Sequence, residues 1–291
     1  PTTVFLFSSF TYDAFVIALL MLGIALFVTE YLSEEKIQTK RTMVSILAIV
    51  VGCFSKAVYI PFLALYWLMP KDKFYSRRQK NLFKAGIFVL LILMFASFIL
   101  PLIGNVTSGA EVGDYRGGDT SQTSQLSMIL GYPLTYTGVL LKSLGTTFAS
   151  YFIGSKVLAN FAYRGIYDGI GYFVVLLTML FTFVTDFGMT EKIYDAQMKR
   201  KIFIMKIWNA VLIFGTACLV WTALYLDFTP VGSMVINGVS PRYYLPLIFP
   251  LSLIFINQKV RCSMKLENYQ SLIAFLMLIG TGISIYCLML A

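Results

Sequence analysis

Residues 71–103, KDKFYSRRQKNLFKAGIFVLLILMFASFILPLI, join a strongly basic segment to a long apolar run. Every Lys and Arg of this stretch lies between residues 71 and 84, and the run over 85–103 has no charged residue. A helix over this run is long enough for the roughly 30 Å hydrocarbon core of a bilayer. Because basic residues concentrate on the cytoplasmic side of membrane helices, the stretch predicts a transmembrane helix that begins in the cytoplasm.

The composition of the whole chain points to the same class of protein. The 291 residues are 58% hydrophobic and 13% charged, which is more apolar surface than a soluble domain can hide. The sequence has no His, which excludes Ser-His-Asp triads, HExxH zinc sites and imidazole proton relays. Its four cysteines form neither CxxC spacing nor a disulfide pattern. We therefore predict an integral membrane protein without a metal cluster; the one cofactor left open is a divalent cation held by carboxylates.

The apolar segments predict an all-α, polytopic transmembrane helical bundle of about eight spans, at 13–32, 42–55, 57–70, 85–103, 166–185, 207–226, 243–257 and 270–290. Four basic connections between them contain most of the 23 Lys and Arg residues. By the positive-inside rule these connections are cytoplasmic, so most of the net charge of +9 is an orientation signal and not a nucleic-acid surface. The segments 42–55 and 57–70 are too short to cross the bilayer and predict a hairpin of two short helices that borders a cavity.

Residues 104–165 are predicted to form an outer-face loop and an interfacial helix. The first part, GNVTSGAEVGDYRGGDTSQTSQ, is rich in Gly, Ser and Thr, which is typical of a loop. A membrane crossing by the second part would place the third basic connection outside, so we expect an amphipathic or re-entrant helix there. We interpret 1–291 as a single membrane domain. Since it starts at Pro1 without a signal-like segment, we expect it to be the C-terminal part of a longer protein.

Six basic residues lie outside the four cytoplasmic connections, all of them in the predicted outer half: Lys56, Arg116, Lys142, Lys156, Arg164 and Arg242. Ionisable residues at membrane level are energetically costly and often functional. Some of them also have structural explanations. Lys56 can extend to water along its own side chain, Arg116 can decorate a solvated loop, and Arg164 can pair with Asp168 four residues later on one helix face.

Arg242 and Asp13 are the strongest candidates for function. Arg242 directly precedes an apolar segment on the outer side, away from the usual anchoring charges, and its planar guanidinium suits bidentate phosphate binding. Asp13 begins the first apolar segment. It is either a carboxylate favoured by the helix dipole or a carboxylate that faces a site at membrane level.

Three stretches carry a resemblance to a known family: SSFTYDAFVIALL (8–20), GCFSKAVYIPFLAL (52–65) and GVSPRYYLPLIFP (238–250). In order and spacing they resemble the bacterial predicted membrane protein family known as domain of unknown function 2142, which is similar to the GT-C superfamily of membrane glycosyltransferases. The stretch TPVGSMVINGVSPRYYLP (229–246) is the most specific, and the resemblance covers nearly the whole chain. It implies a GT-C-like multi-pass bundle in the bacterial plasma membrane, with the active site facing outside.

The resemblance implies sugar transfer from a polyprenyl-phosphate donor to an envelope glycan or lipid-linked acceptor, with membrane lipids but no nucleic acid as further partners. GT-C enzymes keep a catalytic acidic residue in the first outer loop, which would lie upstream of Pro1, so Asp13 is the candidate within this chain. The leaving phosphate needs cations, for which we predict Arg242 with Lys56 and Arg164. The predicted substrate-groove residues are Tyr12, Tyr59, Arg116, Asp168 and Tyr243.

Other functions are consistent with parts of this pattern. A transporter or flippase for a lipid-linked envelope polysaccharide also needs cations in a membrane cavity, but it should have broken helices in two corresponding halves, and only 42–70 shows such a pair. A polysaccharide polymerase or ligase shares the lipid-phosphate chemistry and usually has a longer outer loop. A non-catalytic scaffold explains the apolar segments but not the outer charges. The glycosyltransferase is therefore the favoured prediction.

Overall fold

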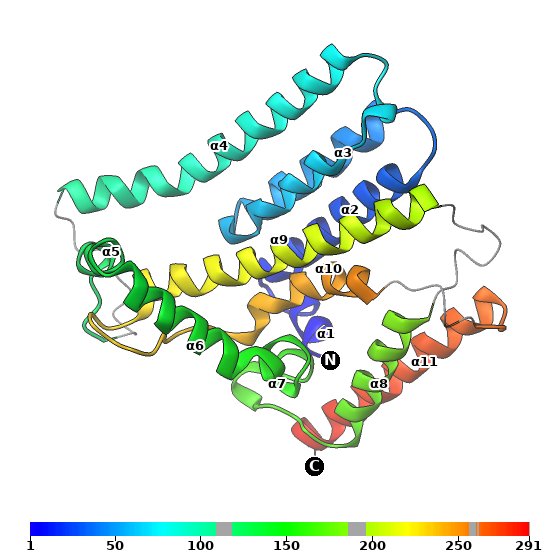
Figure 1. The fold of residues 1–291 in the computed structure, drawn as a ribbon. Helices are drawn as coiled ribbons and strands as arrows, with labels where there is room; N and C mark the ends of the chain where they lie inside the picture. The colour runs from blue at the N-terminus through cyan, green and yellow to red at the C-terminus, as the bar shows by residue number, and fades with distance from the viewer. Residues whose placement is uncertain (109–117, 186–195, 256–259, 261, 291) are drawn as a thin grey trace. The chain divides into compact units, whose positions relative to one another are not determined.

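Helices make up most of the computed structural model, which describes residues 1–108, 118–185, 196–255, 260 and 262–290. Among these residues, four helices are long and apolar enough to cross a membrane: α2 (Asp13–Leu32), α4 (Arg77–Ser108), α9 (Ala196–Phe228) and α11 (Leu266–Ile285) (Figure 1). No strand occurs in the described part of the chain. The predicted all-α membrane class is thereby confirmed, and the larger number of spans stays a prediction.

The chain forms two compact units. The first, named here the hairpin unit, comprises Phe15–Phe148 and Val211–Tyr243, and the second, the terminal unit, comprises Pro1–Ala14, Ala149–Ala210 and Tyr244–Ala291. The shorter helices of the hairpin unit are α3 (Thr39–Cys53), η1 (Ala57–Leu68), η2 (Lys71–Lys73), α5 (Gln122–Gly131), most of α6 (Pro133–Phe152) and most of η5 (Pro241–Tyr244). Those of the terminal unit are α1 (Thr2–Phe7), α7 (Ser155–Leu158), η4 (Ala162–Arg164), α8 (Ile170–Val184), α10 (Leu245–Phe255) and η6 (Tyr286–Leu290).

The predicted hairpin of short helices is present as α3 and η1, which join at residues 54–56. Tyr66, near the end of η1, bonds through its hydroxyl to Ser45 in the first half of α3, so the two helices run antiparallel. The second arm is a 3₁₀ helix of 12 residues that contains Pro61. A 3₁₀ helix rises about 2.0 Å per residue against about 1.5 Å in an α-helix. The 12 residues of η1 therefore extend about as far as the 15 residues of α3.

Helix α2 packs directly against α3 through a glycine contact. The Ser45 hydroxyl donates a 2.5 Å hydrogen bond to the carbonyl oxygen of Gly23. A Cβ added at Gly23 would lie 2.9 Å from the Ser45 carbonyl oxygen and 2.5 Å from the Ile49 side chain. Because only a residue without a Cβ permits this approach, Gly23 sets the separation of the two helices.

In the terminal unit, α8 lies along α11 (Figure 1). Gly171 and Gly280 form the contact, since a Cβ at either one would come within 3 Å of the other's carbonyl oxygen. The buried Asn209 of α9 donates through its side-chain amide to the carbonyl oxygen of Pro250 in α10. Small residues and side-chain amides are the usual means of holding membrane helices together.

Two predicted boundaries change in the structure. Helix α4 continues to Ser108, so the predicted loop does not start at 104. The segment expected to form an interfacial helix contains the 20-residue helix α6, which is not among the helices apolar enough to cross a membrane, and its interfacial position stays a prediction. The segment 243–257 begins in the 3₁₀ turn η5, whose first residue is Pro241, and the α-helix α10 starts only at Leu245.

Candidate functional site

The turn of the α3–η1 hairpin brings two predicted site residues against a third. Lys56 lies between the two helices, and its side chain is 8% exposed. Its Nζ lies 4.0 Å from the centre of the Tyr243 ring, a cation–π contact. The Tyr59 hydroxyl donates a 2.6 Å hydrogen bond to the Tyr243 carbonyl oxygen across 184 positions of sequence. Lys56, Tyr59 and Tyr243 therefore form one cluster, although Tyr243 lies far along the chain from the other two.

Arg242 belongs to this cluster as the residue before Tyr243. Both lie in the 3₁₀ turn η5, whose Tyr243 N–H donates a 3.1 Å hydrogen bond to the Ser240 carbonyl oxygen. The side chain of Arg242 is exposed, whereas Lys56 is buried. The cluster thus presents two cations, one buried against an aromatic ring and one accessible with its planar guanidinium. We name Lys56, Tyr59, Arg242 and Tyr243 the cationic cluster.

The loop that leads to Arg242 is held in shape by its own turns. The Asn237 N–H donates a 3.1 Å hydrogen bond to the Thr229 hydroxyl oxygen. Gly238 has a φ of 78°, and a Cβ there would lie 2.3 Å from the Phe228 ring. A side chain at this position would therefore be strained both by the backbone angle and by the contact. These features explain the INGVSP sequence that precedes Arg242.

The same loop is tied to α5 by a residue that the sequence did not single out. Gln125 is fully buried, and its amide donates hydrogen bonds to the carbonyl oxygens of Thr229 (2.9 Å) and Pro230 (3.0 Å). The Gln122 amide donates a 2.5 Å hydrogen bond to Asp227 beside them. Both glutamines lie in a polar stretch that is typical of a loop, so no local pattern distinguishes them.

Asp13 and Tyr12 belong to the terminal unit. Asp13 is the first residue of α2, its side chain is 3% exposed, and its N–H donates a 3.1 Å hydrogen bond to the Thr11 hydroxyl. A carboxylate at this position is favoured by the helix dipole. Tyr12 is exposed. The role of Asp13 in catalysis stays a prediction.

Arg164 and Asp168 do not share a helix face, so the prediction that they pair there is wrong. Arg164 ends η4, and Gly165 follows with a φ of 101°, which breaks the helix before α8 begins at Ile170. Both side chains are exposed, and the structure records no ion pair between these two described residues. The Arg164 guanidinium instead lies 5.7 Å from the centre of the Tyr163 ring. Arg116, another predicted groove residue, lies outside the described residues.

A comparison with known families decides which group of proteins this is. Residues 1–251 match the family described as Predicted membrane protein (DUF2142). The chain belongs to the DUF2142 family. A search of curated proteins and a search of solved structures found no match. All three stretches that carry the resemblance, and the whole cationic cluster, lie within the part that matches DUF2142.

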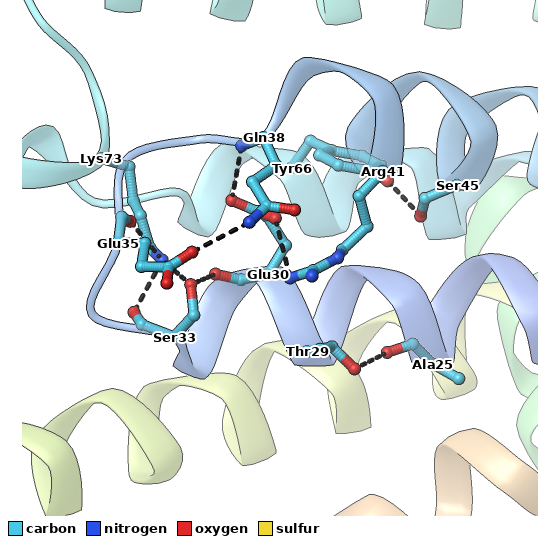
Figure 2. Close-up of polar contacts among 10 residues, drawn as sticks. All are labelled: Ala25, Thr29, Glu30, Ser33, Glu35, Gln38, Arg41, Ser45, Tyr66 and Lys73. Atoms are coloured by element: carbon cyan, nitrogen blue, oxygen red, sulfur yellow. Dashed lines mark hydrogen bonds and ion pairs between the residues drawn. The ribbon is translucent and has the colours of Figure 1, made fainter.

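The DUF2142 protein has a second polar network, at the end of the hairpin opposite the turn (Figure 2). Glu30 is 1% exposed; it accepts a 3.0 Å hydrogen bond from the Gln38 N–H and forms a 3.4 Å ion pair with Arg41. Lys73 is also 1% exposed and donates to the carbonyl oxygens of Ser33 (2.6 Å) and Glu35 (3.0 Å). The sequence predicts Arg41 and Lys73 only as orientation signals, whereas in the structure both also hold the ends of helices together.

Nothing in the arrangement of side chains in the described part of this DUF2142 chain indicates a bound metal ion. No group of three or more Cys, Asp or Glu side chains there is placed to hold a metal ion. The cationic cluster carries two positive side chains, so it attracts anions and not metal cations. A guanidinium and an ammonium side by side are groups that suit a phosphate or a carboxylate.

Proposed function

We propose that this protein transfers a sugar from a polyprenyl-phosphate donor to an envelope glycan or lipid-linked acceptor on the outer face of the bacterial plasma membrane. The observation that carries the proposal is the cationic cluster, in which Lys56 contacts Tyr243 beside Arg242. The positive-inside rule predicts that the hairpin turn bearing Lys56 faces outward, because both open ends of the hairpin carry basic connections.

The cationic cluster suits the leaving group of this reaction. The acceptor hydroxyl oxygen attacks the anomeric carbon, the bond from that carbon to the phosphate oxygen breaks, and its electron pair stays on the phosphate. Arg242 offers two parallel N–H donors to two phosphate oxygens. Lys56 adds a compact charge in a largely buried position, where solvent screens it less than at the surface. Both cations therefore stabilise the negative charge that grows as the bond breaks.

The acceptor proton requires a carboxylate base. Asp13, the largely buried first residue of α2, is the candidate for this base. Tyr59 and Gln125 act as positioning residues, since each hydrogen-bonds the backbone of the segment that bears Arg242. Arg164, Tyr12 and Asp168 remain predicted substrate contacts.

Helix α3 has an exposed apolar surface that could contact the lipid chain of the donor. Exposed apolar side chains follow one another along this helix up to the turn: Met43, Val44, Leu47, Val51 and Phe54. Their spacing places them along one face of the helix, which ends next to Lys56. A polyprenyl chain along this face would bring its phosphate to the cationic cluster.

The test is sugar transfer by the full-length protein from a radiolabelled polyprenyl-phosphate sugar to envelope glycan. We expect Arg242→Ala to lower the rate of transfer roughly a hundredfold, because the loss of one preorganised donor to a developing charge has about this effect. Lys142→Ala is the matched control, since it removes an exposed cation of the same unit outside the cluster. Transfer by Arg242→Ala at the rate of the control would remove Arg242 from the mechanism.

A further inference from the structure

A second cationic site lies in the hairpin unit where α4 begins. An open cavity of about 620 Å³ is lined by Lys36, Lys71, Asp72, Phe74, Tyr75, Ser76, Arg77 and Lys80. It lies at the open end of the hairpin, opposite the turn that carries Lys56. The cavity is therefore separate from the cationic cluster, and the proposed sugar transfer makes no use of it.

The walls of this cavity are held by hydrogen bonds between two loops. The Lys36 ammonium donates to the carbonyl oxygens of Asp72 (2.8 Å) and Phe74 (3.3 Å). The Ile37 N–H donates a 2.9 Å hydrogen bond to the Lys73 carbonyl oxygen. Lys73 itself points away into the Ser33–Glu35 loop, where Figure 2 shows its bonds. Hydrogen bonds thus hold residues 71–76 against residues 33–37, and the fold fixes the walls of the cavity.

The charge of the cavity is strongly positive. Four cationic side chains, Lys36, Lys71, Arg77 and Lys80, line it against the single carboxylate of Asp72. The structure records no hydrogen bond or ion pair from the side chains of Lys71, Arg77 or Lys80 to any described residue. An anion in the cavity would therefore neutralise charges that the described part of the protein leaves uncompensated.

A second, apolar groove lies further along α4. The groove has a volume of about 470 Å³ and is lined by Trp67, Phe88, Leu91, Ile92, Phe95, Ala96, Ile99 and Leu100. The Lys84 ammonium, which lies between the cavity and the groove, donates a 2.9 Å hydrogen bond to the Trp67 carbonyl oxygen. The α4 residues that line the cavity or the groove include 77, 80, 88, 91, 95 and 99, whose separations are close to whole helical turns. They share one face of the helix.

We propose that this face of α4 binds an anionic glycerophospholipid, with its phosphate in the cavity and an acyl chain in the groove. Basic residues directly next to a membrane helix attract anionic headgroups. Eight residues of helix, about 12 Å, separate Lys80 from the start of the groove at Phe88, and the groove extends about 18 Å further to Leu100. A free phosphate matches only the cavity, whereas a phospholipid matches both parts. The basic connections place this site on the predicted cytoplasmic face.

The first test measures lipid binding to the full chain by native mass spectrometry, with phosphatidylglycerol and phosphatidylcholine as probes. The variant K71Q/R77Q/K80Q is expected to bind phosphatidylglycerol roughly a hundredfold more weakly, since each basic residue near an anionic headgroup contributes about fivefold. The control K199Q/R200Q/K201Q removes the same charge from another predicted cytoplasmic segment and should leave binding unchanged. Equal weakening in both variants, or equal binding of both lipids by the unmodified protein, would overturn the proposal.

The second test separates a lipid from a free phosphate. Ala96→Trp fills the groove and should weaken phosphatidylglycerol binding at least tenfold, while inorganic phosphate still protects Lys71 and Lys80 from amine-specific labelling. Leu93→Trp is the matched control, because Leu93 is exposed on α4 but does not line the groove. If Ala96→Trp binds phosphatidylglycerol as well as Leu93→Trp does, the cavity is an anion site without a lipid groove, and the proposal fails.

Discussion

Lys56 and Lys73 are two buried lysines at opposite ends of one hairpin, and their surroundings differ. The Lys73 ammonium donates to the Ser33 hydroxyl and to two carbonyl oxygens, which uses its three hydrogens. The Lys56 ammonium lies over the ring of Tyr243. A lysine bonded by backbone carbonyls holds loops together, whereas a cation on an aromatic face beside Arg242 suits an anionic ligand. We therefore assign Lys73 to stability and Lys56 to function.

This assignment predicts opposite effects for two matched substitutions. Lys73→Met should lower the free energy of unfolding by about 1–3 kcal/mol, because it removes three partly buried hydrogen bonds to a charged donor. Lys56→Met should change stability less and lower sugar transfer at least tenfold. Thermal unfolding in detergent and the transfer rate per folded molecule measure the two effects. A Lys56→Met variant that transfers normally would contradict the role of Lys56.

Helices α2, α3 and η1 pack as one element of the hairpin unit. Gly23 permits the close approach of α2 to α3, and the Ser45 hydroxyl links the backbone of α2 with Tyr66 of η1. The 3₁₀ form of η1 lets its 12 residues match the length of α3. Packing, and not helix propensity, therefore sets where the hairpin lies relative to α2.

Gly23→Ala tests this packing. The added Cβ would lie 2.9 Å from the Ser45 carbonyl oxygen, so the two helices must separate, and we expect a loss of about 1–3 kcal/mol in the free energy of unfolding. Gly86→Ala is the control, because a Cβ there meets nothing within 4 Å. Alanine favours a helix over glycine, so the control should be neutral or slightly stabilising in the same unfolding measurement. Equal stability of the two variants would show that Gly23 does not limit the helix separation.

At the scale of the whole chain, the two proposed sites require opposite sides of the membrane. The cationic cluster needs the outer face, where the donor sugar is expected, and the α4 site needs the cytoplasmic face. The basic connections at 36–41 and 71–84 lie at the open end of the hairpin, and the turn at 54–56 lies at the other end. The charge distribution therefore predicts the orientation that both proposals require.

Single cysteines introduced into a background without the four natural ones test the orientation. Asp119→Cys should react with an impermeant thiol reagent in intact cells, and Ser76→Cys should react only after the membrane is opened. Both positions are exposed in the structure, so burial does not decide the result. The reverse labelling pattern would place the cationic cluster in the cytoplasm and exclude an extracytoplasmic donor site.

The sequence alone predicted the membrane class, the positions of the long helices and the hairpin of short helices. These features depend on the length of an apolar run and on the charges beside it, and both can be read from a short stretch of sequence. Arg242, Lys56, Tyr59 and Tyr243 were also recognised as candidates from sequence. Their assembly into one cluster depends on a hydrogen bond across 184 positions, which no local pattern encodes.

The tertiary structure alone decided the roles of residues whose partners are distant or whose backbone is irregular. Gln125 holds the loop of Arg242 through two carbonyl oxygens more than a hundred positions away. Arg164 and Asp168 have helical spacing, but the positive φ of Gly165 ends the helix between them. The basic cavity and the apolar groove each combine residues of α4 with residues of η1 or of the segment that follows it, so both depend on the packing of η1 on α4. Local sequence sets which segments become helices, and long-range packing sets which side chains meet.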